Sequence, residues 1–456
     1  MSELSPNITI PEGYDRDPFI RDLFLKIENS NDSFFILGKA GTGKTTFLQY
    51  LIQHSKKNII VTSFTGIAAV NVGGTTLHSL FLFPIKPFLP ADADLPIFSK
   101  NHRRRKLIEK MDMLVIDEIS MVRADILEAI DYGLRVNGGN PSLSFGGKQI
   151  VIVGDLFQLP PVVDERNPTE HQLFSTIYSS PYFFGAPAFK RHEFNRVELQ
   201  KIYRQLDGEF KEILNKVRVG KVSERELNKL NYRYFGEFNQ DEEDFTLTLV
   251  TRNKQAADIN ERRMRMLDSE PFQFAAKVDG EFPKDRYPTD FILSLKKDAQ
   301  IIFIRNDISG SDKSKPGGRR WVNGTIAKVY AIHQDNIEVL LENGEVHAVE
   351  KVTWENKSYR LNLSEGRIMA ETIGTFSQYP IKSAWAVTIH KSQGLTFDKV
   401  IIDLGFGAFS SGQTYVALSR CRSLEGIILK KELRHEDIFV DPRVVDFYMN
   451  ATNLLQ

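Results

Sequence analysis

One eight-residue segment constrains the fold of this chain more than any other feature. Residues 38–45 read GKAGTGKT and fit the pattern G-x-x-x-x-G-K-[ST], between an apolar run at 33–37 and a helical pattern at 45–52. Glycines let consecutive backbone N–H groups converge on phosphate oxygens, and the following helix presents the positive end of its dipole. We therefore expect an α/β domain with a phosphate-binding loop that holds a nucleotide through Gly38, Ala40, Gly41, Thr42, Gly43, Lys44, Thr45 and Thr46.

Two acids complete the expected hydrolytic site. Residues 114–118 read LVIDE, which predicts a buried strand with acids at its carboxyl end, where open α/β sheets bind their ligands. Lys44 is expected to neutralise the β- and γ-phosphates, while Thr45 and Asp117 hold Mg²⁺. Glu118 is expected to polarise the attacking water. Glu118 directly after Asp117 favours hydrolysis of the nucleotide over phosphoryl transfer to a hydroxyl acceptor.

Strand and helix patterns alternate in two sets, which predicts two domains with parallel sheets. The first set has apolar runs at 58–63, 113–118 and 149–155 and a helix at 124–136. The second set has strands at 246–250, 400–404 and 427–430 and a helix at 254–267. Between them, Arg320–Tyr359 is dense in Val, Ile, Tyr and Trp with turns at 323–324 and 343–344, which predicts a small inserted antiparallel barrel. We expect domains at 1–190, at 191–311 with 373–456, and an insertion at 312–372.

Composition excludes several classes of protein. Lys and Arg number 59 and Asp and Glu number 59, so the formal net charge is 0 and nucleic acid is not bound by bulk charge, although a local basic groove remains possible. The sequence contains no run of about 18 apolar residues, so we expect no membrane-spanning helix. The single cysteine, Cys421, excludes an intramolecular disulfide and a cysteine-based metal cluster. Residues 1–12 lack the layout of a targeting signal, so we expect an intracellular protein, in the cytoplasm or nucleoid if bacterial.

Three further side chains are candidates for sensing the γ-phosphate. Gln158 lies in the segment GDLFQLPP, where it could report the loss of the phosphate to a proline-stiffened loop. Arg204 and Arg420 lie in the second set of elements, in LQKIYRQ and YVALSRCR. Arginines that reach a γ-phosphate from a second domain typically accelerate hydrolysis roughly 10³- to 10⁵-fold and couple domain closure to the nucleotide. The alternatives are an ordinary turn for Gln158 and surface salt bridges for the two arginines.

Several long motifs occur in the order and form of superfamily-one helicases: the phosphate loop, LVIDE, GDLFQLPP, AWAVTIHKSQG at 384–394 and YVALSRCRS at 415–423. The chain resembles the PIF-type subgroup, close to the RecD-like branch, and the segments at 62–81 and 145–150 favour this subgroup. The resemblance implies two RecA-like domains with ATP between them, and it adds Gly394 to the nucleotide site. It also implies that the inserted barrel is SH3-like.

The resemblance further implies an ATP-dependent motor that moves 5′-to-3′ on single-stranded DNA and separates strands. Forked or tailed duplexes, DNA–RNA hybrids and G-quadruplexes are the implied substrates. DNA repair, recombination and telomere maintenance are the implied processes. Nothing in the sequence requires more than a monomer.

A ratcheting motor is expected to hold DNA phosphates with short polar groups and backbone N–H groups, which read no base sequence. Such groups follow predicted strands or begin helices, and family matching places them along the DNA: Thr65, Gly66, Thr251, Arg252, Asn253, Thr388, Lys391 and Ser392. Phe64, His78 and His390 could stack on bases, each stack worth roughly 1–3 kcal/mol. The alternatives are a core position for Phe64 and structural roles for both histidines.

Four questions stay open in the sequence. Residues 1–48 contain no glutamine, whereas related helicases often carry one there that reads adenine, so other nucleotides could serve. The basic run His102–Lys106 either touches the duplex or is a solvated helix face. The strand-separating wedge is either Asn71–Gly74 or Pro84–Pro96. The alternatives to a helicase are a nucleotide-gated single-stranded-DNA-binding protein that never unwinds and an NTPase that remodels proteins.

Overall fold

The computed structural model of the chain describes residues 14–64, 69, 72–84, 86–164, 167–205, 207–235, 245–307, 320–334, 336–362 and 367–452. The chain divides into two compact units. Unit 1 contains Met1–Tyr203, Lys357–Thr372 and Asp441–Gln456. Unit 2 contains Arg204–Asn356 and Ile373–Val440.

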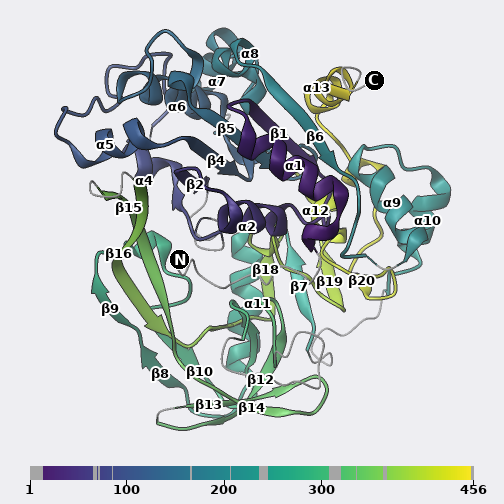
Figure 1. Cartoon of the computed structure of the whole chain (residues 1–456). Helices are drawn as coiled ribbons and strands as arrows, with labels where there is room; N and C mark the ends of the chain where they lie inside the picture. The colour runs from purple at the N-terminus through teal and green to yellow at the C-terminus, as the bar shows by residue number, and fades with distance from the viewer. Residues whose placement is uncertain are drawn as a thin grey trace. The chain divides into compact units, whose positions relative to one another are not determined.

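Unit 1 is built on a six-stranded sheet with the order β3-β2-β4-β5-β1-β6, in which every neighbouring pair is parallel (Figure 1). Its strands are β1 (Ser33–Gly38), β2 (Ile59–Ser63), β3 (Thr75–Thr76), β4 (Met113–Asp117), β5 (Gln149–Gly154) and β6 (Phe194–Leu199). Every residue of β1, β4 and β5 is buried, as expected for strands covered on both faces. The predicted parallel sheet of the first domain is confirmed.

Helices cover both faces of this sheet, and side-chain alternation in β1 decides which residue meets which helix. Phe34 and Ile36 pack against the apolar residues of α1 (Pro18–Asn29) and α2 (Lys44–His54). Phe35 points to the other face, where its ring lies 6.3 Å from that of Phe189. The other helices of this part are α4 (Leu77–Phe81), α5 (Arg103–Lys110), α6 (Ala124–Val136), α7 (Pro168–Gln172) and α8 (Pro187–Arg191).

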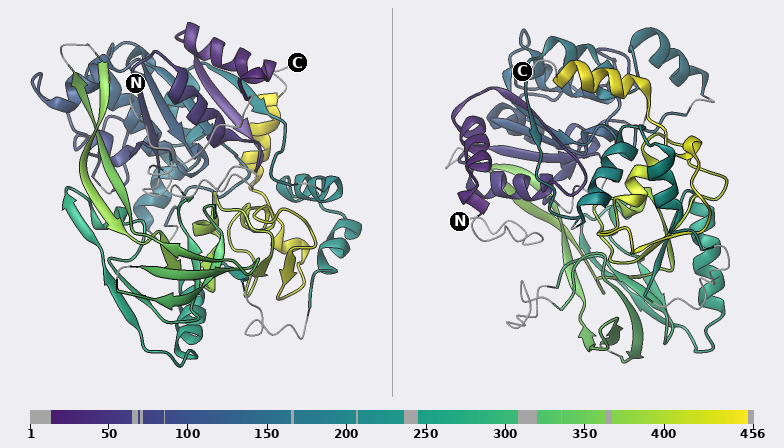
Figure 2. Two further views of the ribbon diagram at one scale, coloured as in Figure 1. Left: turned by 60° about the horizontal axis from the view of Figure 1, so that its bottom comes forward. Right: turned by 90° about the vertical axis from the view of Figure 1, so that its right-hand side faces the viewer.

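The last helix, α13 (Pro442–Thr452), belongs to unit 1. The ring of Phe447 stacks on Phe184 with centroids 4.2 Å apart, and it also lies 6.4 Å from Phe35 of the central strand. Figure 2 shows this helix, drawn in yellow, beside the helices of unit 1. The sequence interpretation assigned all of 373–456 to the second domain. The structure corrects this boundary, because the aromatic face of α13 completes a cluster on the first sheet.

Unit 2 contains a four-stranded sheet with the order β18-β7-β19-β20, again parallel throughout. Its strands are β7 (Leu247–Val250), β18 (Ala386–Thr388), β19 (Val400–Asp403) and β20 (Ile427–Leu429). Its helices are α9 (Gly208–Arg218), α10 (Glu224–Asn231), α11 (Asn253–Arg265) and α12 (Gln413–Leu418). The second predicted α/β domain is therefore confirmed.

Unit 2 also carries antiparallel structure, and it extends beyond the predicted insertion at 312–372. One sheet has the order β14-β13-β12-β11-β17, with β11 (Gln300–Phe303), β12 (Ile326–Ile332), β13 (Ile337–Leu341), β14 (Val346–Val349) and β17 (Ile381–Ser383). β11 and β17 lie outside the predicted bounds because β12 takes β11 as its partner. The strand order of the described residues has two free ends, so closure into an SH3-like barrel stays a prediction.

The remaining strands form two smaller sheets. One has the order β15-β16-β9 and the other pairs β10 with β8. Their bounds are β8 (Phe272–Ala275), β9 (Lys277–Gly280), β10 (Ile292–Leu295), β15 (Val352–Asn362) and β16 (Arg367–Gln378). No helix within the described residues is long and apolar enough to span a bilayer.

Candidate functional site

The phosphate loop connects β1 to α2 at the carboxyl edge of the unit 1 sheet. Gly41 and Gly43 have φ angles of 79° and 81°, in the left-handed region that favours glycine. A Cβ on Gly38 would lie only 2.4 Å from the hydroxyl of Thr42, which itself donates to the Lys39 carbonyl at 2.9 Å. The loop is therefore a tight turn in front of the first turn of α2, as the motif predicts.

Lys44 is the first residue of α2, and its side chain folds back over this loop. Its Nζ donates to the carbonyl oxygens of Gly38 and Lys39 at 2.8 and 3.0 Å. Thr45 and Thr46 follow in the same first turn and are half-buried. The first turn of α2 thus carries one ammonium, held over the loop carbonyls, and two hydroxyl side chains that follow it directly in the chain.

The two acids lie at the end of β4, and β5 separates this strand from β1 in the sheet. Asp117 is buried, and burial together with the charge of Glu118 raises the pKa of its carboxyl to about 7, against the opposing effects of the Glu118 N–H and Lys44. Glu118 has a φ of 54°, which is uncommon for a residue other than glycine. A Cβ on Gly154 would lie 2.9 Å from Ile119, so glycine permits β5 to pack closely on the turn that carries Glu118.

Oxygen donors at this edge fit a hard divalent cation. Mg²⁺ usually binds one or two carboxylates and completes its shell with waters and substrate phosphates. Thr45 supplies a hydroxyl and Asp117 a buried carboxylate. Within the described part of the chain, no cluster of three or more His, Cys, Asp or Glu could hold a metal alone. The donors therefore fit an ion that is held jointly with a nucleotide.

Gln158 follows β5 and is buried. Its Nε2 donates to Asp155 at 3.4 Å, and the Phe157 N–H donates to the other Asp155 oxygen at 3.3 Å. Asp155 is fully buried and organises this turn, a role that the sequence reading missed although GDLFQ displays the residue. The turn places Gln158 just after β5, the strand that lies between β1, which leads into the phosphate loop, and β4, which ends in the two acids.

Tyr203 is a second residue that the sequence reading missed. Its N–H donates to the Gly41 carbonyl at 2.8 Å, and its ring lies 3.6 Å from the position that a Cβ on Gly43 would occupy. The side chain is 48% exposed, so a flat aromatic face borders the phosphate loop and can stack on a nucleobase. The sequence shows this tyrosine in the segment LQKIYRQ, from which only Arg204 was taken as a candidate.

The first group of predicted DNA-contacting residues lies beyond β2 and β3 in unit 1. The rings of Phe64 and His78 meet edge to face with centroids 6.3 Å apart, and both side chains are half-buried. Burial lowers the pKa of His78, so the imidazole is neutral at pH 7. Thr65 and Gly66 lie outside the described residues. Phe64 is only half-buried, so it does not occupy the core position that was its alternative role.

The basic run His102–Lys106 begins α5, and its arginines engage protein groups. Arg104 donates to the carbonyls of Ser79 and Leu80, and Arg103 pairs with Glu371 at 2.8 Å. Arg104 therefore ties α5 to the helix that carries His78. These contacts favour a structural role for the run over a duplex-binding role.

The second group of predicted DNA-contacting residues lies in unit 2 at the ends of β7 and β18, which are paired through Val250 and Thr388. Arg252, Asn253 and Lys391 are exposed there, whereas Thr251 and Thr388 are buried. Burial lowers the pKa of the half-buried His390.

Two residues of this segment differ in what they expose. Ser392 is fully buried, and its hydroxyl donates to the Ile389 carbonyl at 2.8 Å. This hydroxyl therefore does not face a DNA strand bound at the surface. Gly394 is exposed with a φ of 80° and has open space around its Cα. The predicted polar segment is therefore present, but its serine points inward.

The two candidate arginines lie together in unit 2. Arg420 is 2% exposed, which shows that a surface salt bridge is the wrong description of it. Its Nε donates to the Val416 carbonyl at 3.0 Å and its Nη2 to the Ser419 hydroxyl at 3.0 Å. Arg204 donates to the Ser419 carbonyl at 3.3 Å. Burial, and then the neighbouring Arg420, lower the pKa of Arg204 to about 9, so the Arg204 guanidinium stays charged at neutral pH.

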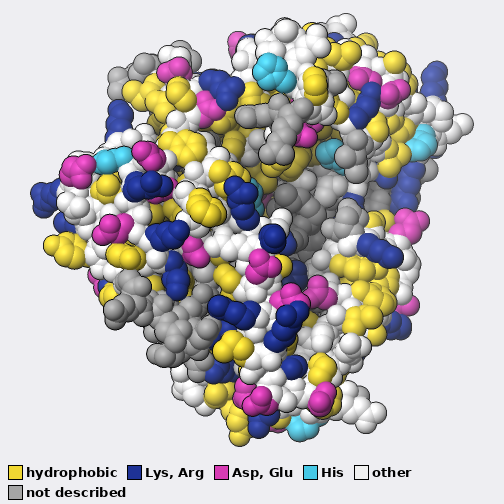
Figure 3. Space-filling view, turned by 180° about the vertical axis from the view of Figure 1, so that it is seen from behind, with side chains coloured by type: hydrophobic (Ala, Val, Ile, Leu, Met, Phe, Trp, Pro, Cys, Tyr) yellow, Lys and Arg dark blue, Asp and Glu magenta, His cyan; other side chains and the backbone are white. Residues whose placement is uncertain are grey.

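Charge on the face drawn in Figure 3 is mixed: Lys and Arg side chains are interspersed with Asp and Glu. This pattern agrees with a formal net charge of 0. Any contact with a polyanion on such a surface depends on a few local groups and not on the overall field.

Comparisons with known proteins agree with the site. A family model described as PIF1-like helicase matches residues 21–228, and a second model described as helicase matches 362–449. The ATP-dependent DNA helicase Pif1 of Bdellovibrio bacteriovorus is 33% identical over 436 residues, which cover 94% of this chain and 91% of that protein.

Solved structures of a Bacteroides Pif1 are also similar to this chain. The complex with ADP-AlF4 is 37% identical, with 98% of each chain covered and a TM-score of 0.85. The same helicase bound to single-stranded DNA is 38% identical, with 98% of each chain covered and a TM-score of 0.66.

Proposed function

Because the chain belongs to the PIF1-like helicase family and is an ATP-hydrolysing DNA helicase, we propose that it moves 5′-to-3′ along single-stranded DNA and separates strands ahead of it. The observation that carries the proposal is the arrangement of unit 1, where a nucleotide site and an aromatic pair lie along one sheet. The solved structures of a Bacteroides Pif1 that resemble this chain include a complex with ADP-AlF4 and a complex with single-stranded DNA.

Nucleotide chemistry in this proposal uses groups that the fold positions in advance. The Lys44 ammonium and the loop N–H groups bind the β- and γ-phosphates, where they oppose the negative charge of the transition state. Glu118, fixed by its left-handed backbone at the end of β4, orients the attacking water. Gln158 contacts the γ-phosphate from the neighbouring strand end, and its partner Asp155 passes the loss of this contact to the following loop.

A magnesium ion would be held by Thr45 and Asp117 together with the phosphates. When bound, it supplies positive charge that screens the β- and γ-oxygens. The oxygen donors of this edge support the assignment, and the raised pKa of Asp117 shows how strongly burial opposes an isolated charge there.

We also propose that Arg204 and Arg420 stabilise the transition-state charge. The support is that the two guanidiniums lie next to each other, both hydrogen-bonded to Ser419, in the segments whose motifs resemble those of helicases. Gly394 joins the nucleotide site only as an implication of the family motif.

For the DNA track, the proposal combines stacking with phosphate contacts. In unit 1, Phe64 and His78 present the aromatic pair, and in unit 2 Arg252, Asn253 and Lys391 present exposed polar groups. Contacts of this kind release and rebind without reading sequence. Forked and tailed duplexes are the proposed substrates, and DNA–RNA hybrids and G-quadruplexes extend the list. DNA repair, recombination and telomere maintenance are the proposed settings, with the chain acting as a monomer.

Residues 1–48 contain no glutamine that could read adenine, so we propose that the nucleobase is held by stacking instead. Tyr203 borders the phosphate loop with a half-exposed ring, and stacking on such a ring accepts any nucleobase. We therefore expect hydrolysis of GTP as well as ATP.

A strand-displacement assay with ATP tests the function. We expect unwinding of a duplex with a 5′ tail, no unwinding of a duplex with only a 3′ tail, and ATP hydrolysis that single-stranded DNA stimulates. Lys44→Ala is expected to abolish hydrolysis, because it removes the ammonium that is held over the loop carbonyls of Gly38 and Lys39. Lys56→Ala is the matched control, because Lys56 is exposed and lies two residues beyond the end of α2.

Three outcomes would contradict parts of this proposal. Unwinding of the 3′-tailed duplex would overturn the direction. Hydrolysis by Lys44→Ala at the wild-type rate would overturn the site assignment. DNA binding and ATP hydrolysis without displacement of either tailed strand would favour a nucleotide-gated DNA-binding protein.

A further inference from the structure

Phe406 is the most exposed large apolar side chain of the described residues, with 99% of its surface accessible. It lies on the loop between β19 and α12, in the sequence Leu404–Gly412. Glycines flank it, and Gly405 and Gly407 have φ angles of 64° and 122° that favour glycine. A phenylalanine gains about 2 kcal/mol or more from burial, so its complete exposure on an ordered loop calls for a partner.

Hydrogen bonds hold this loop in place on both sides of the ring. Asp403 accepts from the Gly405 N–H at 2.8 Å, and Lys431 donates to the Gly405 carbonyl at 2.8 Å. Asp437 accepts from the Ala408 N–H at 3.1 Å. The backbone on both sides of Phe406 is therefore fixed before any ligand arrives, which lowers the entropy cost of binding.

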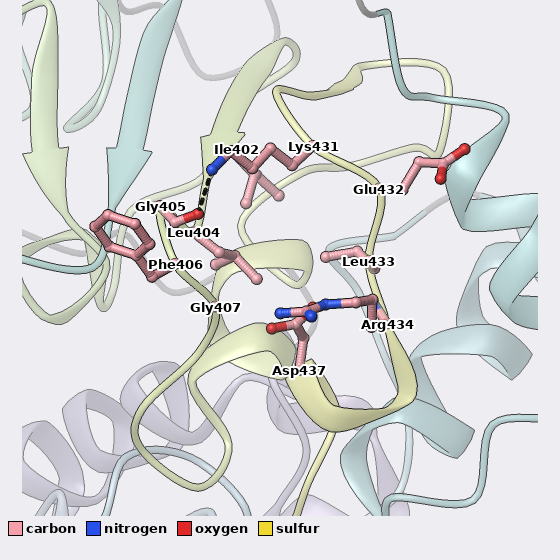
Figure 4. Close-up of a pocket in the computed structure, with 10 residues that line it drawn as sticks. All are labelled: Ile402, Leu404, Gly405, Phe406, Gly407, Lys431, Glu432, Leu433, Arg434 and Asp437. Carbon is pink, nitrogen blue, oxygen red and sulfur yellow. Dashed lines mark hydrogen bonds and ion pairs between the residues drawn. The ribbon is translucent and has the colours of Figure 1, made fainter.

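Figure 4 shows the surroundings of the ring. Phe406 is one of the residues that line a recess of about 280 Å³, together with Arg434 and Asp437, and its ring lies at the edge of this group. The Nζ of Lys431 lies 5.6 Å from the centre of the ring. An exposed aromatic face with a cation beside it suits a base and its phosphate, because every nucleobase offers a π-face and every nucleotide of a strand carries one negative charge.

The position of the loop connects it to the proposed DNA track. β19 is hydrogen-bonded to β7, with Asp403 opposite Val250, so the residues that follow both strands share one edge of the sheet. The guanidinium of Arg252 lies 5.5 Å from the ring of Phe409, which is 54% exposed on the same loop. One segment of the track thus touches the loop that carries Phe406.

We propose that Phe406 is a stacking site for a nucleobase of single-stranded DNA, with Lys431 next to the adjoining phosphate. The assignment rests on the proposed function of the chain as a motor on single-stranded DNA. It adds an aromatic stacking group to the proposed track in unit 2, whereas Phe64 and His78 are the proposed stacking groups of unit 1. The site reads no base identity, because stacking is tolerant of sequence.

The test measures binding of fluorescently labelled oligothymidylate to the full chain by anisotropy, with wild type, Phe406→Ala and Phe406→Trp. A stack of the usual strength predicts at least about fivefold weaker binding by Phe406→Ala and near wild-type binding by Phe406→Trp. A second oligomer of equal length carries abasic sites throughout. Phe406→Ala and wild type should bind this oligomer equally, since no base is present to stack.

Phe272→Ala is the matched control, because Phe272 is 50% exposed on β8 of the same unit and lies outside the proposed track. Equal binding of oligothymidylate by wild type and Phe406→Ala would overturn the stacking site. Equal weakening on the abasic oligomer would also overturn it, since the effect would then not involve a base. Failure of the wild-type chain to bind either oligomer or to unwind would instead refute the proposed function.

Discussion

Replacing Arg420 by alanine should destabilise unit 2 as well as slow hydrolysis. The side chain is 2% exposed, and its guanidinium donates to the carbonyls of Val416, Ser392 and Leu395 and to the hydroxyl of Ser419. Alanine removes these donors and leaves buried acceptors behind. A variant designed to remove only a catalytic charge would therefore also remove a structural connection between the motif at 384–394 and α12.

The expected size of this effect follows from the four hydrogen bonds. Each bond contributes about 0.5–1.5 kcal/mol net, and two of them are long at 3.4 Å, so we expect a loss of about 3 kcal/mol. For a domain of 150–250 residues, a change of 1 kcal/mol moves the melting temperature by about 2–4 °C. Arg420→Ala should therefore lower the melting temperature of unit 2 by roughly 6–12 °C.

Scanning calorimetry of the full chain measures this shift. Arg422→Ala is the control two residues away, since Arg422 forms an exposed ion pair with Asp398 and such pairs contribute about 0–1 kcal/mol. Arg420→Lys keeps the charge but cannot reproduce the fork of donors, so it should restore only part of the loss. A melting temperature of Arg420→Ala within 1–2 °C of wild type, that is less than about 1 kcal/mol, would refute the structural role.

Three other predictions follow from single contacts. Tyr203→Ala should raise KM for ATP about fivefold while Tyr203→Phe leaves it unchanged, because the ring and not the hydroxyl borders the loop; equal KM values in steady-state hydrolysis would contradict the stacking role. Phe447→Ala should cost about 2 kcal/mol of unfolding free energy by loss of stacking on Phe184, whereas the exposed Met449→Ala should cost little, as thermal melts can compare. Burial lowers the pKa of His192 in the folded chain below the value of about 6.5 that histidine has in the unfolded chain. As the pH falls below about 6.5, the unfolded chain therefore takes up a proton before the folded chain does, and the folded chain loses stability. Urea unfolding at pH 7.5 and 5.5 should therefore show a smaller loss of unfolding free energy for His192→Gln than for wild type. An equal loss in both proteins would show that His192 does not cause the pH dependence.

Much of the nucleotide site was accessible from local sequence. A loop of the form found at 38–45 is expected to bind phosphate with its own backbone, so neighbouring residues in the chain are also neighbours in the candidate site. The strand ending at Asp117 was recognisable because an apolar run followed by acids places those acids at a defined edge of a parallel sheet. The helix predicted at 124–136 coincides with α6 for a similar reason, since its apolar spacing is local.

Other features depended on contacts between distant parts of the chain. Ser392 lies in a recognisable motif, yet its hydroxyl turns inward to Ile389, and no spacing rule specifies that direction. The basic run at 102–106 could be read as a DNA-binding face until Arg104 was seen to bind the carbonyls of α4. The bounds of the antiparallel insertion shifted because β11, the partner of β12, lies at Gln300–Phe303, before the predicted start at residue 312.

Short-range patterning was thus sufficient for the phosphate loop, the acids of β4 and the two parallel sheets, because each depends on the chemistry of contiguous residues. Tertiary packing alone placed Tyr203 against Gly41, brought Arg204 next to Arg420, and joined α13 to the first unit. Such pairings follow from side-chain volume and hydrogen bonding between segments far apart in sequence, which carry no local signature.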